Sequence, residues 1–196
     1  MGTSDRWCFS GAIRMMLPVY SKQQMLLHWV SAAVILWTLV TGFYVANINV
    51  ANDIKQWVAG VNVSLTTLFI PVFCWRLVLF VRHLRHERMA QVSPGKMLAM
   101  FVHRLIYLLV VVVLLSGVLM MDRPIPVFGL LEFPQPLNDV ALTDGFFVLH
   151  IWACTGLAVL VAMHIGAVIL HELRGYRVLR RMSWRSRIRQ ACGRSG

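Results

Sequence analysis

Four long apolar runs, separated by shorter polar segments, dominate the sequence. They cover about residues 25–46, 58–81, 99–121 and 146–170. An α-helix needs about 20 predominantly apolar residues to cross the hydrocarbon core of a bilayer, so each run is long enough. Because the connecting segments are short, neighbouring helices should run antiparallel. The pattern therefore predicts an all-α protein, a transmembrane four-helix up-down bundle that forms one domain over residues 25–171.

The polar segments beside these runs differ in charge. The N-terminal segment 1–24, the middle loop 82–98 and the tail 172–196 are basic, whereas the loop 47–57 is neutral and the loop 122–145 is acidic. Lys and Arg accumulate beside spans on the cytoplasmic side, so we expect an inner-membrane protein with both termini in the cytoplasm, N-in and C-in. The net charge of +11 is thus explained by topology and by contact with the lipid bilayer, and it does not indicate nucleic acid binding.

The last apolar run contains widely spaced histidines. His150 and His164 lie inside it, fourteen residues apart, and His171 follows at its end. Fourteen helical residues rise about 21 Å and complete nearly four turns, so His150 and His164 face one way, near opposite sides of the membrane. Ionisable residues inside a span indicate function, and helix bundles build cofactor sites from side chains on facing helices. We therefore favour two stacked haem irons over simple hydrogen bonds between helices. No Cys-x-x-Cys-His motif occurs, which argues against covalent attachment.

Topology decides which histidines can meet on the cytoplasmic side. His28 begins the first span there, and the fourth span returns to that side, so His28 and His164 lie at matching depths. These two side chains are the predicted axial ligands of one haem. His103, at the start of the third span, either competes as a ligand or contacts a haem propionate. Arg76, near the end of the second span, either extends to the interface or pairs with a propionate.

His150, on the opposite side, has no histidine partner. At the start of the second span only Asn62 lies at a matching depth, and its amide is a poor ligand for haem iron. Haem iron accepts His, Met, Cys or Tyr as an axial ligand. The remaining candidates for the position opposite His150 are Met120, Met121 and Tyr44.

Two glycines repeat the spacing of the histidines. Gly42 follows His28 by fourteen residues, and Gly117 follows His103 by the same interval. A glycine on that face leaves room for a flat ring to approach the helix, since it has no Cβ. Close packing between helices explains the glycines equally well.

Several motifs in order resemble those of the bacterial cytochrome b561 family, the four-span haem proteins that include superoxide oxidase. The segment 20–29 reads Tyr-Ser-x-x-Gln-x-x-Leu-His-Trp, and the third span contains His-x-x-Ile-Tyr-Leu-Leu from His103. The spacing of the three histidines in and after the fourth span is similar, as is the ending Leu-Arg-Arg-Met at 179–182. The resemblance covers about residues 20–182.

The resemblance implies two b haems, held by axial histidines on the first two spans and by two on the fourth. His28 and His164 match one pair, and His150 matches half of the other. The remaining ligand would fall at Asn62, where this chain departs from the family. Either His150 binds a haem whose sixth position is open or taken by Met120, Met121 or Tyr44, or Asn62 and His150 hydrogen-bond each other across an empty second site. We favour the empty site, and so expect about one haem b per chain, because one axial bond is a weak hold on a haem that lacks its second histidine.

The family implies electron transfer between a donor and the quinone pool of the respiratory chain, with quinone as substrate. One activity in the family is superoxide:ubiquinone oxidoreduction. An alternative is a haem-bearing membrane anchor for a partner dehydrogenase or a periplasmic cytochrome c, with the acidic segment 122–145 as the docking surface, and a third is an adaptor without haem. His171 is a candidate contact for quinone or a proton, or else binds lipid headgroups. The sequence indicates no catalytic residue.

Overall fold

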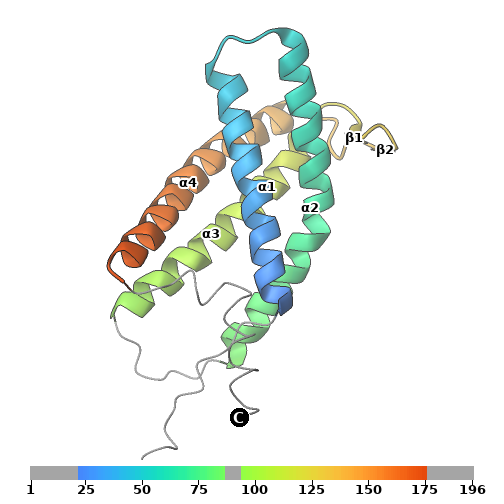
Figure 1. The fold of residues 1–196 in the computed structure, drawn as a ribbon. Coiled ribbons are helices and arrows are strands. Elements are labelled where there is room, and N and C mark those ends of the chain that lie inside the picture. The colour runs from blue at the N-terminus through green and yellow to red at the C-terminus, as the bar shows by residue number, and fades with distance from the viewer. Residues whose placement is uncertain (1–21, 87–93, 176–196) are drawn as a thin grey trace, which may run out of the picture.

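The computed structural model describes residues 22–86 and 94–175, which form four long α-helices and one short β-hairpin (Figure 1). The helices are α1 (Lys22–Asn47), α2 (Asn52–His86), α3 (Pro94–Leu119) and α4 (Val140–Leu173), and the strands are β1 (Ile125–Val127) and β2 (Leu131–Phe133). Each helix is long and apolar enough to cross a membrane. The predicted all-α, four-span bundle is confirmed, whereas its N-in, C-in orientation stays a prediction. The N-terminal segment 1–21, the segment 87–93 and the tail 176–196 lie outside the described residues.

The connections between helices are shorter than predicted. α2 begins at Asn52, so about half of the segment 47–57, predicted as a loop, is helical. In the middle loop, α2 continues to His86 and α3 begins at Pro94, a residue that suits the first turn because its missing N–H has no helical partner there. A helix bonds its own backbone, so it continues past the hydrocarbon core without loss. At its other end α3 stops at Leu119, two residues before the predicted limit.

The acidic segment 122–145, predicted as a loop, is partly regular. β1 and β2 pair antiparallel, and the backbone N–H of Leu130 donates to the Val127 carbonyl oxygen at 3.0 Å. The two turn residues, Phe128 and Gly129, have φ angles of 48° and 70°. Turns of this kind, with both central φ angles positive, suit two-residue hairpins because their twist matches that of the strands.

Two side chains fix this segment in place. Ser64 of α2 is buried, and its hydroxyl accepts a hydrogen bond from the Phe128 N–H at 3.0 Å and donates to the Pro126 carbonyl at 3.1 Å. The Asp139 carboxylate caps α4 by accepting from two backbone N–H groups of its first turn. This cap explains why α4 begins at Val140 and not near residue 146. The hairpin is therefore held against the bundle at the end where α4 begins.

The four helices form two antiparallel pairs. α1 packs along α2 and α3 along α4, whereas α2 and α3 contact each other little, and Figure 1 shows the two pairs inclined to each other. The core between the pairs contains Phe69 and Phe73 of α2, Val110 of α3 and Leu157 of α4. Many other large apolar side chains are exposed, as expected for helices that face lipid.

Candidate functional site

Five side chains gather towards the end of the bundle where α1 and α3 begin. We name them the Arg76 cluster: His28 of α1, Arg76 of α2, His103 and Tyr107 of α3, and His164 of α4. The Arg76 guanidinium donates to His28 Nδ1 at 3.0 Å and to the Tyr107 hydroxyl at 2.9 Å, and its carbon lies 5.1 Å from the centre of the Tyr107 ring. His28 is also within electrostatic range of His164 and His103. All four helices thus contribute to one cluster.

The contact with Arg76 fixes the protonation of His28. A guanidinium has only donors, so Nδ1 of the neutral imidazole must accept, and the ring proton is on Nε2. Neutral imidazole binds a metal through a nitrogen lone pair. In His28 the Nδ1 lone pair is engaged by Arg76, and Nε2 has none to offer. His28 could therefore bind a metal only if Arg76 released it.

The two other imidazoles of the cluster lie edge to face. The ring centres of His103 and His164 are 5.0 Å apart, with an angle of 84° between the planes. His103 Nδ1 donates to the Ala99 carbonyl at 2.7 Å, so Nε2 of the neutral ring keeps its lone pair. Within the described part of the chain, the nitrogens of His164 make no hydrogen bond. Both rings therefore present a lone pair that a metal or a hydroxyl can use.

One member of the cluster, Tyr107, was not predicted. Its ring stacks on Phe80 of α2, with centres 4.1 Å apart and planes 10° from parallel. Tyr107 follows His103 by four residues, and side chains at that interval share a helix face, so the spacing could have identified it. His171 lies outside the cluster, exposed near the end of α4, about 10 Å beyond His164 along the helix.

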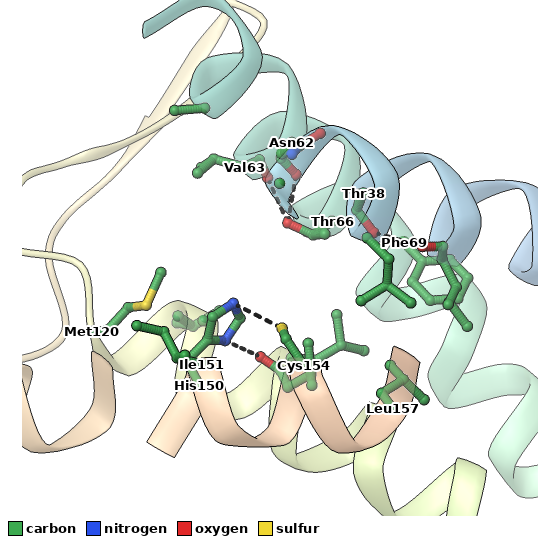
Figure 2. Close-up of a pocket in the computed structure, with 18 of the residues that line it drawn as sticks. Thr38, Asn62, Val63, Thr66, Phe69, Met120, His150, Ile151, Cys154 and Leu157 are labelled. Atoms are coloured by element: carbon green, nitrogen blue, oxygen red, sulfur yellow. Dashed lines mark hydrogen bonds between the residues drawn. The ribbon is translucent and has the colours of Figure 1, made fainter. Parts of the chain in front are cut away.

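The other half of the bundle contains a cavity of about 570 Å³, which we name the His150 cavity. Its mostly apolar walls come from all four helices, and Figure 2 shows Asn62 of α2 and His150 of α4 on opposite sides. Gly42 and Gly117 both line it. Small-molecule and cofactor sites usually enclose about 300–1,000 Å³, so the cavity has the size of a ligand site.

The predicted hydrogen bond between Asn62 and His150 is wrong, because each side chain bonds residues on its own side of the cavity. The Thr41 hydroxyl donates to the amide oxygen of Asn62 at 3.1 Å. His150 Nδ1 lies 3.1 Å from both the Val113 carbonyl oxygen and the Ser116 hydroxyl oxygen. The cavity remains open between the two walls.

These contacts hold the His150 ring in one tautomer. A carbonyl only accepts, and the Ser116 hydroxyl gives its own proton to the Val112 carbonyl at 2.6 Å, so both neighbours of Nδ1 are acceptors. Nδ1 therefore carries the proton and Nε2 the lone pair. Cys154 Sγ, one turn along α4, lies 3.4 Å from Nε2. Gly117 leaves room for the ring, because a Cβ there would lie 3.2 Å from His150 Cε1.

The structure narrows the candidates for the position opposite His150. Tyr44 is 47% exposed and is not among the residues that line the cavity. Met120 and Met121 line it just beyond the end of α3, and Figure 2 shows Met120 on the His150 side. Among the described residues of α1 and α2 that line the cavity, none is His, Met, Cys or Tyr. The wall that faces His150 presents the Asn62 amide in place of a haem ligand.

Comparison with known families decides what kind of protein this is. Residues 19–185 match the family described as prokaryotic cytochrome b561. The chain belongs to the prokaryotic cytochrome b561 family. This confirms the resemblance, and it makes the protein a multi-pass membrane b-type cytochrome of a haem b-containing family that transfers electrons and interacts with quinones. No individual curated protein matched the chain.

Haem b is the cofactor of the cytochrome b561 family, and the two groups of residues fit it to different degrees. In the Arg76 cluster, His28 and His164 project from different helix pairs and are imidazoles, which haem iron accepts as axial ligands. That pair would become available if Arg76 released His28. In the His150 cavity one imidazole is already arranged as a ligand, and the opposite wall supplies no second one.

Proposed function

We propose that the protein carries electrons between a donor and the quinone pool through a haem b that His28 and His164 hold in the Arg76 cluster. The observation that carries this proposal is the convergence of side chains from all four helices, with His28 from one helix pair, His103 and His164 from the other, and Arg76 bonded to both His28 and Tyr107. A bound haem supplies a reversible one-electron couple, while the protein supplies ligands, orientation and burial. Both ligands being imidazoles, this site should be six-coordinate and low-spin.

Arg76 has two successive partners in this proposal. When its hydrogen bond to His28 is broken, the guanidinium still donates to the Tyr107 hydroxyl. The Tyr107 ring is itself held by stacking on Phe80. A guanidinium freed of one acceptor inside a bundle needs another, and a carboxylate is the strongest that haem offers. Arg76 would therefore pair with a propionate, while the released His28 ring moves its proton to Nδ1.

His103 has a different role from Arg76. Its Nδ1 proton is already donated to the Ala99 carbonyl, so the neutral ring offers only an acceptor at Nε2. A propionate is also an acceptor and would require His103 to be protonated. A quinol hydroxyl is a donor and suits the neutral ring. We therefore propose that His103 Nε2 accepts a hydrogen bond, and then the proton, from a quinol hydroxyl. His171 would make a second contact to the quinol, nearer the membrane interface.

The finer activity in this proposal is superoxide:quinone oxidoreduction, supported by membership of a quinone-interacting family. Two superoxide anions each lose one electron and become O₂, and the two electrons with two protons reduce one quinone to quinol. The test uses the protein in liposomes with ubiquinone and a superoxide source. Quinol should form only with haem-loaded protein and should cease when superoxide dismutase is added. Quinol formation that superoxide dismutase leaves unchanged would exclude superoxide as donor.

A second candidate, a membrane anchor for a redox partner, is supported by the exposed hairpin. Four large apolar side chains of this acidic segment are exposed: Phe128, Leu130, Leu131 and Phe133. An apolar patch with acidic neighbours suits a protein partner with a basic rim. Purification in mild detergent separates the candidates, because an anchor would elute with a stoichiometric dehydrogenase or cytochrome c.

The ligand assignment is tested with His164→Ala. The reduced-minus-oxidised spectrum of the purified variant should lose the low-spin b-type contribution, while the protein still inserts into the membrane. Met163→Ala is the matched control, since Met163 is its neighbour and 59% exposed on the outer surface. An unchanged low-spin spectrum in His164→Ala would refute the assignment.

A further inference from the structure

The His150 cavity is large and is not closed by the departure from the family at position 62. It measures about 570 Å³ and is lined mainly by aliphatic and aromatic side chains of both helix pairs. The expectation of a single haem rests on the missing second axial ligand, since one axial bond is a weak hold on haem, with Asn62 and His150 bonded to each other across the empty site. In the structure these two side chains bond other residues, and the cavity stays open between them.

His150 is arranged as metal-binding histidines usually are. Such residues donate the second ring N–H to a carbonyl, carboxylate or water, which fixes the ring and raises the basicity of the other nitrogen. Here Nδ1–H is directed to the Val113 carbonyl and the Ser116 hydroxyl, each at 3.1 Å. Among the residues that the structure describes, the hydrogen-bonding partner of Nε2 is the thiol of Cys154, at 3.4 Å. A thiol is a weak donor, so little opposes its replacement by iron.

The cavity wall that faces His150 has a polar side chain, the Asn62 amide, but no usual axial ligand of haem iron. The Asn62 amide is tied to Thr41 of the neighbouring helix, which fixes its place on that wall. Neither end of an amide is a usual axial ligand of haem iron. A small molecule bound on this side of the cavity would lie beside the Asn62 amide and the Thr66 side chain, with mainly apolar walls around it.

We propose that the His150 cavity binds a second haem b through His150 alone, and that its other axial position, on the side of Asn62, accepts small exogenous ligands such as carbon monoxide. The proposal rests on membership of a haem b family and does not depend on the ligands assigned in the Arg76 cluster. The protein would then hold one low-spin haem and one high-spin haem that binds diatomic gases.

The first experiment compares purified full-length protein with and without carbon monoxide. We expect about two haems per chain, of which about half give a carbon monoxide difference spectrum after reduction, since a site with two strong ligands is closed to the gas. One haem per chain without a carbon monoxide complex would overturn the proposal.

Variants then locate the carbon monoxide site. His150→Gly should lose the complex, and added imidazole should restore it by taking the place of the missing side chain. Asn62→His should keep the haem but make it low-spin and unreactive with carbon monoxide, which also shows that the protein is folded. Carbon monoxide binding that survives both changes would assign the open haem elsewhere.

Two controls separate this proposal from neighbouring explanations. Cys154→Ala should leave the carbon monoxide spectrum in place, whereas a displaced spectrum would make the thiol the ligand and contradict the role of His150. His164→Ala should remove only the low-spin haem. If His164→Ala instead leaves the low-spin haem, the assignment in the Arg76 cluster fails while the carbon monoxide result still stands.

Discussion

The Arg76 cluster and the His150 cavity each place an imidazole inside the bundle, but they use its Nδ1 atom in opposite ways. In the Arg76 cluster, Nδ1 of His28 accepts a hydrogen bond from a cation. In the His150 cavity, Nδ1 of His150 donates to a backbone carbonyl and a hydroxyl. The first arrangement occupies the lone pair that a metal needs, and the second presents one.

The difference shows that two properties of a metal site vary separately. One is how many candidate ligands the site has, and the other is whether the lone pair of a ligand is available to the metal. The cluster with two candidate ligands must first break a hydrogen bond to a charged group, a bond that contributes roughly 1.5–3 kcal/mol. In the proposed haem site, Arg76 would recover this by pairing with a propionate carboxylate. The cavity with one ligand has only a weak thiol contact to replace. A site with one candidate axial ligand can therefore be better prepared for a metal than a site with two.

The largest expected effect comes from His28→Ala. With one axial ligand gone, the low-spin haem of the Arg76 cluster should disappear completely, while the carbon monoxide-binding haem remains. Trp29→Phe is the matched control, because Trp29 is adjacent and 53% exposed. Absorption and carbon monoxide difference spectra measure both haems in one sample. Loss of both haems together would contradict the independence of the two sites.

The next prediction concerns which side of the membrane each region faces, and its readout is the presence or absence of reporter activity. A reporter fused after Gly196 should be active only if it functions in the cytoplasm, because the basic segments predict N-in, C-in topology. The Arg76 cluster would then lie on the cytoplasmic side and the His150 cavity on the periplasmic side. Alkaline phosphatase activity from this fusion would reverse the assignment of the two regions.

A moderate effect is expected from Tyr107→Phe. The change removes the acceptor of the Arg76 Nε–H and keeps the stacking on Phe80. Leaving such a donor unpaired costs about 1–3 kcal/mol. The low-spin haem should be released at a lower temperature, as followed by its absorption in detergent, and the carbon monoxide-binding haem should be unaffected. Tyr44→Phe, at an exposed tyrosine, should change neither.

The smallest effect is expected from Gly117→Ala. The new Cβ would lie 3.2 Å from His150 Cε1, so the ring must move by a few tenths of an ångström. Carbon monoxide binding should weaken by less than about tenfold, or about 1.4 kcal/mol, without loss of haem. Gly156→Ala is the control, since its Cβ would meet Leu109 at an ordinary 3.5 Å. Equal effects of the two changes would argue that Gly117 has no special relation to His150.

The spans and the histidine positions could be predicted from the sequence because length, hydropathy and helical spacing are local properties. Cys154 and Tyr107 were accessible in the same way, since each follows a chosen histidine by four residues. The cap at Asp139 and the hairpin turn at Phe128 and Gly129 are also local features, but the segment 122–145 that contains them was predicted as a loop.

The contacts of Ser116 with His150 and of Arg76 with His28 could not be predicted, because they depend on how far one helix is shifted along its neighbour. The spacing of residues along a helix shows which face of that helix each residue lies on. It does not show how the helix is shifted along its neighbour. The predicted Asn62–His150 bond failed for a different reason, the separation of the two helix pairs at this depth. Both residues were at the expected depth, but their walls stand apart across the cavity.

The most direct test of the difference between the two regions is an electron paramagnetic resonance spectrum of the oxidised, purified protein. We predict a low-spin ferric signal from the Arg76 cluster and a high-spin ferric signal from the His150 cavity. In Asn62→His the high-spin signal should convert to a second low-spin signal. A wild-type spectrum that contains low-spin haem alone would contradict the account.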